Sequence, residues 1–157
     1  MPEKSAPGAE TTIEKMVVAV ASDHAGFELK EILKVELEQR GHKVVDLGTN
    51  GTASVDYPDF GFAMADALAE GTADRGVLVC GSGVGISIAA NRHAHVRAAV
   101  CTNETMIRLA RLHNDANVLA LGSRIIGAEV AKECLVRFLE TPFEGGRHAG
   151  RVAKLAK

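Results

Sequence analysis

The segment from Cys80 to Gly85 combines a reactive side chain with a glycine-rich loop. Cys80 ends the apolar run GVLVC, and the loop GSGVG follows it directly. Small residues between a strand and a helix let backbone N–H groups converge on one point, where the helix dipole adds positive potential. Such a loop can hold a phosphate or a developing oxyanion, and it favours the thiolate form of a neighbouring cysteine. The alternatives are a turn that only permits close packing and a Cys80 that is only a small core residue.

Polar residues also follow the other apolar runs of the chain. Ligands of open α/β sheets bind at the carboxyl ends of the strands, so these positions are candidates for the same site. Asp23-His24 follows the first run, a loop leading to Tyr57 follows the second, and Ser123-Arg124 follows the fifth. His24 could instead be satisfied by backbone groups at the start of a helix.

Two common nucleotide-binding loops do not fit this segment. The dinucleotide fingerprint G-x-G-x-x-G has Ile86 at its third glycine, and no acidic residue ends the next strand to hold a ribose hydroxyl. A P-loop is excluded because no Gly-Lys-Ser/Thr follows. The loop therefore remains a candidate site for a phosphate or an oxyanion.

A second polar group should lie far from Cys80. His113-Asn114 ends the helix before the fifth strand, so within one subunit it should sit at the opposite edge of the sheet. It either caps that helix or serves a site on a neighbouring subunit. Near the C-terminus, Arg147 and Arg151 are four residues apart on one helical face. This spacing suits a phosphate clamp, with a solvated basic face as the alternative.

The remaining cysteines and histidines point less clearly to chemistry. Cys134 lies on the apolar stripe of a helix and is expected in the core, whereas Cys101, at the end of a strand, is a weaker alternative to Cys80. His93 and His95 could form a metal pair, but no third ligand is near. We therefore expect no metal and no other cofactor.

Short apolar runs alternate with helical periodicity along the chain. Continuous runs of Val, Leu and Ala are typical of parallel strands covered on both faces. The predicted strands are 16–21, 43–47, 76–80, 96–100 and 117–121. The predicted helices are 26–40, 60–70, 84–92, 103–113, 127–140 and 147–156. Asn103 should cap the fourth helix, and Gly41 should end the first. The alternation predicts a doubly wound α/β domain with a five-stranded parallel sheet.

Length, charge and cysteine usage limit the classes of partner. The 157 residues suit one domain over 16–157, and residues 1–15 are predicted to be a disordered extension without a signal peptide. A net charge of −2 argues against a nucleic-acid partner, and no stretch approaches the length of a membrane span. Three widely spaced cysteines imply free thiols and a reducing compartment, so we expect a cytoplasmic protein.

Five segments, taken in order, resemble the ribose-5-phosphate isomerase B family, which also includes galactose-6-phosphate isomerase subunits. They are SDHAGFELK, DYPDF, CGSGVGISIAAN, RLHNDANVLALGSR and EGGRH with Arg151, and they run through about residues 16–152. The resemblance implies a Rossmann-like three-layer αβα sandwich, which agrees with the pattern of strands and helices. It also implies an aldose–ketose isomerase that interconverts D-ribose 5-phosphate and D-ribulose 5-phosphate through an enediolate.

The resemblance implies a role for each matching residue. Cys80 would be the base that carries a proton between C1 and C2, Ser82 would assist proton movement between the two oxygens, and His113 would help to open the sugar ring. The residues that would stabilise the enediolate or bind the sugar and its phosphate are Gly81, Gly83, Gly85, Asp23, Tyr57, Asn114, His24, Arg124, Arg147, His148 and Arg151. Some relatives use a Glu in the following helix as base, but that position here is Ile86, which places the chain with the cysteine-based branch.

The opposite-edge position of His113 leads to a structural hypothesis. One subunit would supply Cys80 and its loop, and another would supply His113 and the C-terminal arginines. One chain holds the full set, so a homodimer should suffice, and dimers could pair into tetramers. The alternatives are an isomerase of allose 6-phosphate, galactose 6-phosphate or a tetrose 4-phosphate, a phosphate-binding module without catalysis, and a structural or regulatory subunit.

Overall fold

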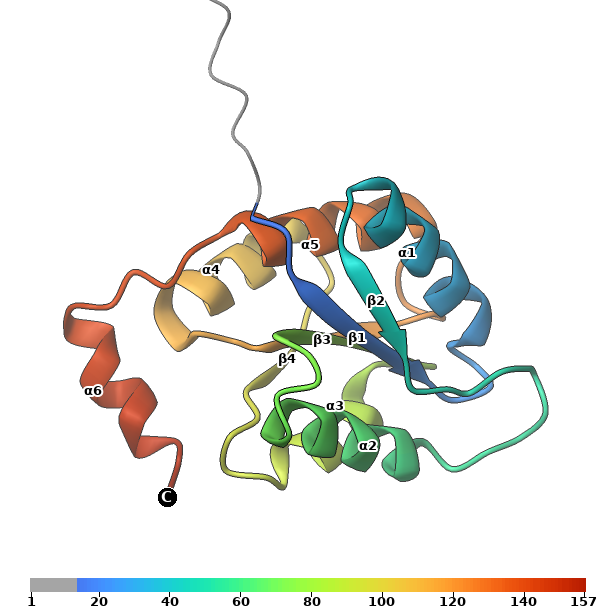
Figure 1. Cartoon of the computed structure of the whole chain (residues 1–157), viewed down its shortest axis with the longest axis horizontal. Helices are drawn as coiled ribbons and strands as arrows, with labels where there is room; N and C mark the ends of the chain where they lie inside the picture. Colours follow the sequence, from blue (N-terminus) through green and yellow to red (C-terminus); the bar gives the residue numbers. More distant parts are fainter. Residues whose placement is uncertain (1–13) are drawn as a thin grey trace, which may run out of the picture.

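A five-stranded parallel sheet forms the centre of the chain, in a computed structural model that describes residues 14–157 (Figure 1). The strand order is β2-β1-β3-β5-β4. The strands are β1 Val17–Ser22, β2 Lys43–Asp46, β3 Arg75–Cys80, β4 Ala98–Val100 and β5 Val118–Gly122. All five predicted strands are present, and the α/β fold class is confirmed.

Within the described residues, five helices alternate with the strands as predicted, and a sixth helix follows the fifth directly. They are α1 Phe27–Gln39, α2 Tyr57–Ala69, α3 Val84–Asn91, α4 Glu104–Asn114, α5 Ala128–Glu140 and α6 Arg147–Lys154. Asn103 caps α4 as expected, since its Oδ1 accepts a hydrogen bond from the Met106 N–H at 3.0 Å. Helix α2 begins at Tyr57 rather than at residue 60, because Pro58 lies in its first turn, where a fixed φ favours the helix and no N–H is needed.

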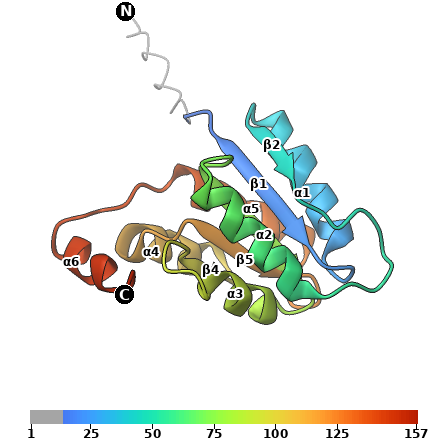
Figure 2. The same cartoon turned by 60° about the horizontal axis from the view of Figure 1, so that its bottom comes forward.

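The helices cover both faces of the sheet (Figures 1 and 2). Alternate strand residues face opposite sides: Val18 and Val20 join a core with α1, α4 and α5, whereas Ala19 and Ala21 join a core with α2 and α3. Small residues on the second face let the helices approach closely. A Cβ added to Gly76 would lie only 2.2 Å from Met64 Sδ, so a larger residue at this position on β3 would force Met64 to move.

The strand order determines where a ligand can bind. The chain leaves β1 for β2 on one side and then returns to β3 on the other, so β1 and β3 flank a topological switch point. In such sheets the crevice lies outside the carboxyl ends of these strands. Cys80 pairs with Gly122, which brings the end of β5 level with the end of β3. Polar residues that follow β1, β3 and β5 therefore meet at one end of the sheet.

Helix α6 lies apart from the layers of the sandwich. It projects beyond the amino ends of the strands and packs against α4 (Figures 1 and 2). Within residues 14–157, no helix is long and apolar enough to cross a membrane. Most of the predicted disordered extension lies outside the described residues. Of its described part, Lys15 donates a hydrogen bond to the Arg40 carbonyl.

Candidate active site

A pocket of about 290 Å³ opens at the carboxyl ends of β1, β3 and β5. The strand–helix junctions bring together side chains that lie up to about 100 residues apart in the chain. The lining residues are Asp23, Tyr57, Cys80, Gly81, Ser82, Gly85, Arg124 and Ile125. Seven of these eight residues were named from the sequence, and Ile125 was not.

Cys80 lies at the base of this pocket. It is only 4% exposed, and the Gly83 N–H donates a hydrogen bond to its Sγ at 3.1 Å. The thiol also lies before the N-terminus of α3, whose dipole favours negative charge. An N–H donor and a helix N-terminus together stabilise a thiolate, the form in which cysteine acts as a base or nucleophile. The sulfur is therefore held by the loop backbone and is reached by a pocket.

The shape of the loop that follows Cys80 requires glycine at position 83. Gly83 has a φ of +80°, and a Cβ there would lie 2.9 Å from the Leu121 carbonyl carbon. A Cβ on Gly85 would lie 2.7 Å from the ring of Tyr57, so the phenol packs directly against the loop. The Gly83 amide, named from the sequence as an enediolate donor, is directed at the Cys80 sulfur.

Asp23 and His24 follow β1 and are fixed by backbone contacts. Asp23 Oδ1 accepts a hydrogen bond from the Gly26 N–H at 3.0 Å, which shapes the turn into α1. His24 lies beside the pocket rather than in its lining, and its Nδ1 accepts a hydrogen bond from the Val55 N–H at 3.2 Å. In the neutral ring the proton must then be on Nε2, which leaves that nitrogen as a donor for an anion.

Ser82 and Arg124 provide exposed polar groups at the pocket mouth. Ser82 Oγ accepts a hydrogen bond from the Val84 N–H at 3.2 Å, and the Arg124 N–H donates to the Gly81 carbonyl at 3.0 Å. A methyl group on Gly81 would lie 3.4 Å from Arg124 Nη1, so the guanidinium lies over the loop. This pocket thus combines a thiol, a hydroxyl, a carboxylate and a cation.

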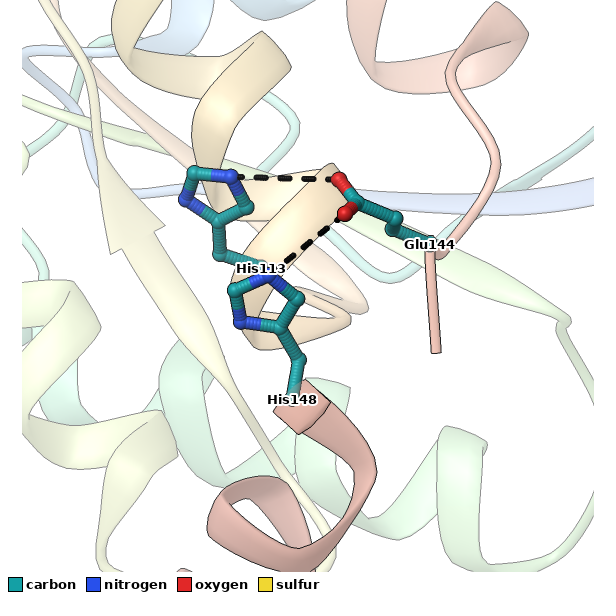
Figure 3. Close-up of side chains that lie close together, drawn as sticks. All are labelled: His113, Glu144 and His148. Atoms are coloured by element: carbon teal, nitrogen blue, oxygen red, sulfur yellow. Dashed lines mark ion pairs between the residues drawn. The ribbon is translucent and has the colours of Figure 1, made fainter. Parts of the chain in front are cut away.

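The second group of site residues lies at the junction of α4 and α6. The His113 and His148 rings stack with centroids 4.4 Å apart and planes at 17°. Glu144 lies beside both, with oxygens 4.0 Å from His113 Nε2 and 3.8 Å from His148 Nε2 (Figure 3). A pocket of about 250 Å³ adjoins this pair, lined by His113, Asn114, His148, Arg151, Val152 and Leu155.

The electrostatics of His148 favour the neutral ring. Burial lowers the pKa of His148, and the neighbouring His113 and the cationic Arg147 and Arg151 lower it further, whereas Glu144 acts in the opposite direction. The two arginines are exposed on α6. This end of the molecule therefore offers imidazole and guanidinium groups to a ligand from outside.

A single chain does not bring the two groups together. Cys80 lies level with Gly122, which ends β5. His113 and Asn114 end α4, just before β5 begins at Val118. The five residues of β5 alone separate these positions by about 13 Å, at about 3.3 Å per residue. His113, Asn114, Arg147, His148 and Arg151 therefore lie at the other end of the sheet, as the sequence indicated.

The structure also shows polar residues that sequence reasoning missed. The buried Lys30 contacts Asp46 at 2.7 Å, Lys34 contacts it at 2.7 Å, and the Gly48 N–H donates to it at 2.9 Å. Burial would raise the pKa of Asp46, but the hydrogen bonds from Lys30 and Lys34 outweigh this effect and lower it. This ion cluster fixes the start of the loop after β2. The same loop carries Val55, whose N–H donates a hydrogen bond to His24. The signal was the position of Lys30, three residues before Leu33 and seven before Leu37, on the buried face of α1.

The structure brings together three possible metal ligands that the sequence did not group. The sequence suggested no three-ligand cluster, yet His113, Glu144 and His148 place three possible ligand atoms within 4.8 Å of one another. Glu144 was not singled out, although it lies four residues before His148 in EGGRH. The pair that was considered, His93 and His95, instead packs edge to face, and His95 Nε2 lies 2.7 Å from the Ala65 carbonyl.

Comparison with known proteins identifies the family. Residues 18–155 match the family model described as Ribose/Galactose Isomerase. The chain belongs to this family. It is 47% identical over 135 residues to ribose-5-phosphate isomerase B of Escherichia coli, covering 86% of this chain and 91% of the relative.

Solved structures of Ribose/Galactose Isomerase relatives have the same fold. The ribose-5-phosphate isomerase B of Clostridium thermocellum superposes with a TM-score of 0.89 at 50% identity, covering 90% of this chain and 95% of that one. The enzyme of Mycoplasma genitalium, solved with bound ribulose 5-phosphate, gives 0.85 at 42% identity, covering 89% and 93%. Within the family fold, position 86 of this chain is an Ile on α3 that is fully buried. It offers no group that could accept a proton, which leaves Cys80 as the candidate base.

Proposed function

We propose that this protein is an aldose–ketose isomerase that interconverts D-ribose 5-phosphate and D-ribulose 5-phosphate. The observation that carries the proposal is the Cys80 sulfur, held at 3.1 Å by the Gly83 N–H at the base of a polar pocket. Members of the same family supply independent support, since relatives of 42–50% identity are named ribose-5-phosphate isomerase B.

Cys80 acts in this proposal as the base for proton transfer. The thiolate removes the proton from C2 of the open-chain aldose, which leaves an enediolate, and then returns it to C1 to form the ketose. Ser82 moves the matching proton between the two oxygens. A positioned base contributes about 10²–10⁴-fold. Each hydrogen-bond donor to the developing oxyanion contributes about 10²–10³-fold.

A second copy of the chain completes the site. His113 opens the sugar ring and Arg147 and Arg151 bind the phosphate, but these residues lie beyond the far end of β5 from the Cys80 sulfur. A homodimer with shared sites places both groups on one substrate, and His24 and Arg124 contribute from the Cys80 side.

Exposed apolar side chains around the pocket support this assembly. Val84 and Ile88 on α3 are 50% and 58% exposed, and Ile125 at the pocket mouth is 57% exposed. Apolar side chains that gather beside a polar site are typical of a surface that another protein covers. We therefore expect the second copy to dock on this side of the molecule.

The substrate is tested by comparing aldose phosphates of different lengths. We expect the highest kcat/KM for ribose 5-phosphate, with lower values for erythrose 4-phosphate, allose 6-phosphate and galactose 6-phosphate. The Cys80→Ala variant should lower kcat/KM by about 10²–10⁴-fold for every substrate that is turned over. A higher kcat/KM for a hexose phosphate would replace ribose 5-phosphate as the assigned substrate. No turnover of any of the four sugar phosphates would overturn the proposed isomerase activity.

The proposed location is the cytoplasm. All three cysteines are free and buried, and no two of them form a disulfide. Free thiols persist in reducing compartments. A thiolate base such as Cys80 also needs such an environment to stay unoxidised.

A further inference from the structure

The group of His113, Glu144 and His148 has the composition of a metal site (Figure 3). Two imidazole nitrogens and one carboxylate, with a fourth position left to water, form a common protein ligand set for Zn²⁺. Imidazole ligands favour Zn²⁺, Co²⁺, Ni²⁺ and Cu²⁺ over Mg²⁺ and Ca²⁺, which prefer oxygen. The proposed isomerisation uses neither Glu144 nor any metal.

A buried nitrogen without a partner points into this group. His148 is only 5% exposed, and its Nε2 has no hydrogen-bond partner among the described residues. In Figure 3 this nitrogen faces the Glu144 carboxylate, whose Oε1 lies 3.8 Å away, too far for a hydrogen bond. A buried polar atom without a partner costs free energy, and a cation between His148, Glu144 and His113 would satisfy it.

The distances allow a metal after a small rearrangement. In a tetrahedral site with bonds of about 2.0–2.1 Å, ligand atoms lie about 3.3 Å apart, so the present separations of up to 4.8 Å must shorten. The stacked rings are nearly parallel, so one ring must also turn for both nitrogens to face one ion. The side chains of His113 and Glu144 are 39% and 53% exposed and can move, whereas His148 is fixed by burial.

The backbone already holds the ligands near one another. The Glu144 N–H donates to the Leu112 carbonyl at 3.1 Å, which ties the loop before α6 to the last turn of α4. The His148 N–H donates to the Gly145 carbonyl at 3.0 Å, at the start of α6. Both elements that carry the ligands are thus joined without the metal, and the adjoining pocket gives access to the fourth position.

We propose that His113, Glu144 and His148 form a binding site for a divalent transition metal, best suited to Zn²⁺, whose occupation inhibits the isomerase. Metal binding is the primary claim. The inhibition rests on the proposed function: a metal on His113 Nε2 occupies the lone pair that ring opening needs. Removal of the ion should restore activity.

Cobalt binding tests the site directly. The full-length protein, freed of metal with a chelator, is titrated with Co²⁺, and the visible absorption of the bound ion is recorded. We expect one ion per chain with a tetrahedral spectrum, in the wild type and equally in Cys80→Ala. Glu144→Gln and His148→Gln should each weaken the affinity at least about 10-fold, because even the loss of a group that only orients a ligand costs about 10–100-fold. His93→Gln is the matched control and should bind as the wild type does.

The opposite results would overturn the site. These are no Co²⁺ binding by the wild type, binding that is lost in Cys80→Ala, or binding by Glu144→Gln that equals the wild type. Circular dichroism of each variant shows whether a loss of binding comes from misfolding. If His148→Gln does not fold, Glu144→Gln, which changes an exposed side chain, decides the question.

Inhibition is measured separately with ribose 5-phosphate. Zn²⁺ should inhibit the wild type, and a chelator should reverse the inhibition. Glu144→Gln should need at least about 10-fold more Zn²⁺, since even a group that only orients a ligand is worth about 10–100-fold in affinity. Equal sensitivity of the two proteins would contradict the inhibitory role. A protein without isomerase activity would contradict the proposed function, while the Co²⁺ titration would still decide whether the metal site exists.

Discussion

The two ends of the sheet hold their functional groups by different means. At the carboxyl end, the Cys80 carbonyl accepts the Ser123 N–H at 2.9 Å, and the Gly83 N–H donates to the Cys80 sulfur. At the amino end, His113 and His148 are held by a ring stack between α4 and the projecting α6. Backbone bonds fix the groups that we propose to transfer the proton, whereas side chains on an outlying helix carry the groups that we propose to bind phosphate. In this proposal, one half of the site is preorganised within the chain, and a second copy completes the other half.

The largest effect should follow removal of the thiol at the preorganised end. Cys80→Ala should lower kcat/KM for ribose 5-phosphate by about 10²–10⁴-fold, because it removes the base. Cys101→Ala is the matched control at another strand end, since burial raises the pKa of Cys101 to about 12 and leaves it an unreactive core thiol. Steady-state kinetics should show kcat/KM nearly unchanged in the control. A Cys80→Ala enzyme with wild-type kcat/KM would refute the assignment of the base.

A smaller loss of kcat/KM should follow a substitution that distorts the loop after Cys80 but removes no reacting group. Gly83→Ala forces alanine into a left-handed conformation, which costs about 1–2 kcal/mol, and places its Cβ against the Leu121 carbonyl. A displacement of about 1 Å at the sulfur can cost about 10² in rate. We expect a Tm lower by several degrees and a kcat/KM about 10²-fold lower. Gly51→Ala, where a Cβ meets nothing within 4 Å, should change neither.

A change at the amino end should act mainly on substrate binding. Arg151→Ala removes a charge-assisted hydrogen bond to phosphate worth about 1.5–3 kcal/mol, so KM should rise by about 10–10²-fold while the thermal stability stays the same. Lys154→Ala, another exposed cation on α6, is the control and should leave KM unchanged. A fall in kcat with constant KM would place Arg151 in the chemical step instead.

The smallest expected effect is a pH dependence of the free energy of unfolding, caused by His42 at the amino end of the sheet. His42 lies in the turn before β2, and burial, with help from the cations Lys15 and Arg40, lowers its pKa. The folded state therefore binds this proton less readily than the unfolded state, and the free energy of unfolding should fall as the pH drops below about 6.5. Urea unfolding at pH 7.0 and 5.5 measures the slope. His42→Gln should reduce it, and an unchanged slope would show that His42 does not contribute.

Local patterns were sufficient to predict the preorganised end from the sequence. The glycine loop after Cys80, the Asn103 cap and the apolar strands are all set by neighbouring residues, and each was predicted within a few positions. The predicted start of α2, at residue 60, was three residues too late. The sequence pattern assigns Pro58 to the preceding loop, whereas in the structure it lies in the first turn of the helix. The position of β5 between β3 and β4 was not predicted, because strand order depends on packing between distant segments.

The amino end was predicted only as separate residues. His113 and the EGGRH segment are about 30 residues apart in the chain, and nothing local indicates that His113 stacks on His148. Glu144 was missed for the same reason, since its relation to His113 arises from the docking of α6 against α4. The Lys30–Asp46 pair was also missed, because a buried ion pair forms only when β2 and α1 are packed together.

The shared site is tested most directly by mixing two inactive variants. Cys80→Ala and His113→Ala chains are unfolded together, refolded, and assayed with ribose 5-phosphate. In a mixed dimer, one site receives an intact Cys80 from one chain and an intact His113 from the other. Random pairing of chains in a symmetric dimer should restore about a quarter of the wild-type activity. Purified mixed dimers with no activity above the parent variants would contradict the account.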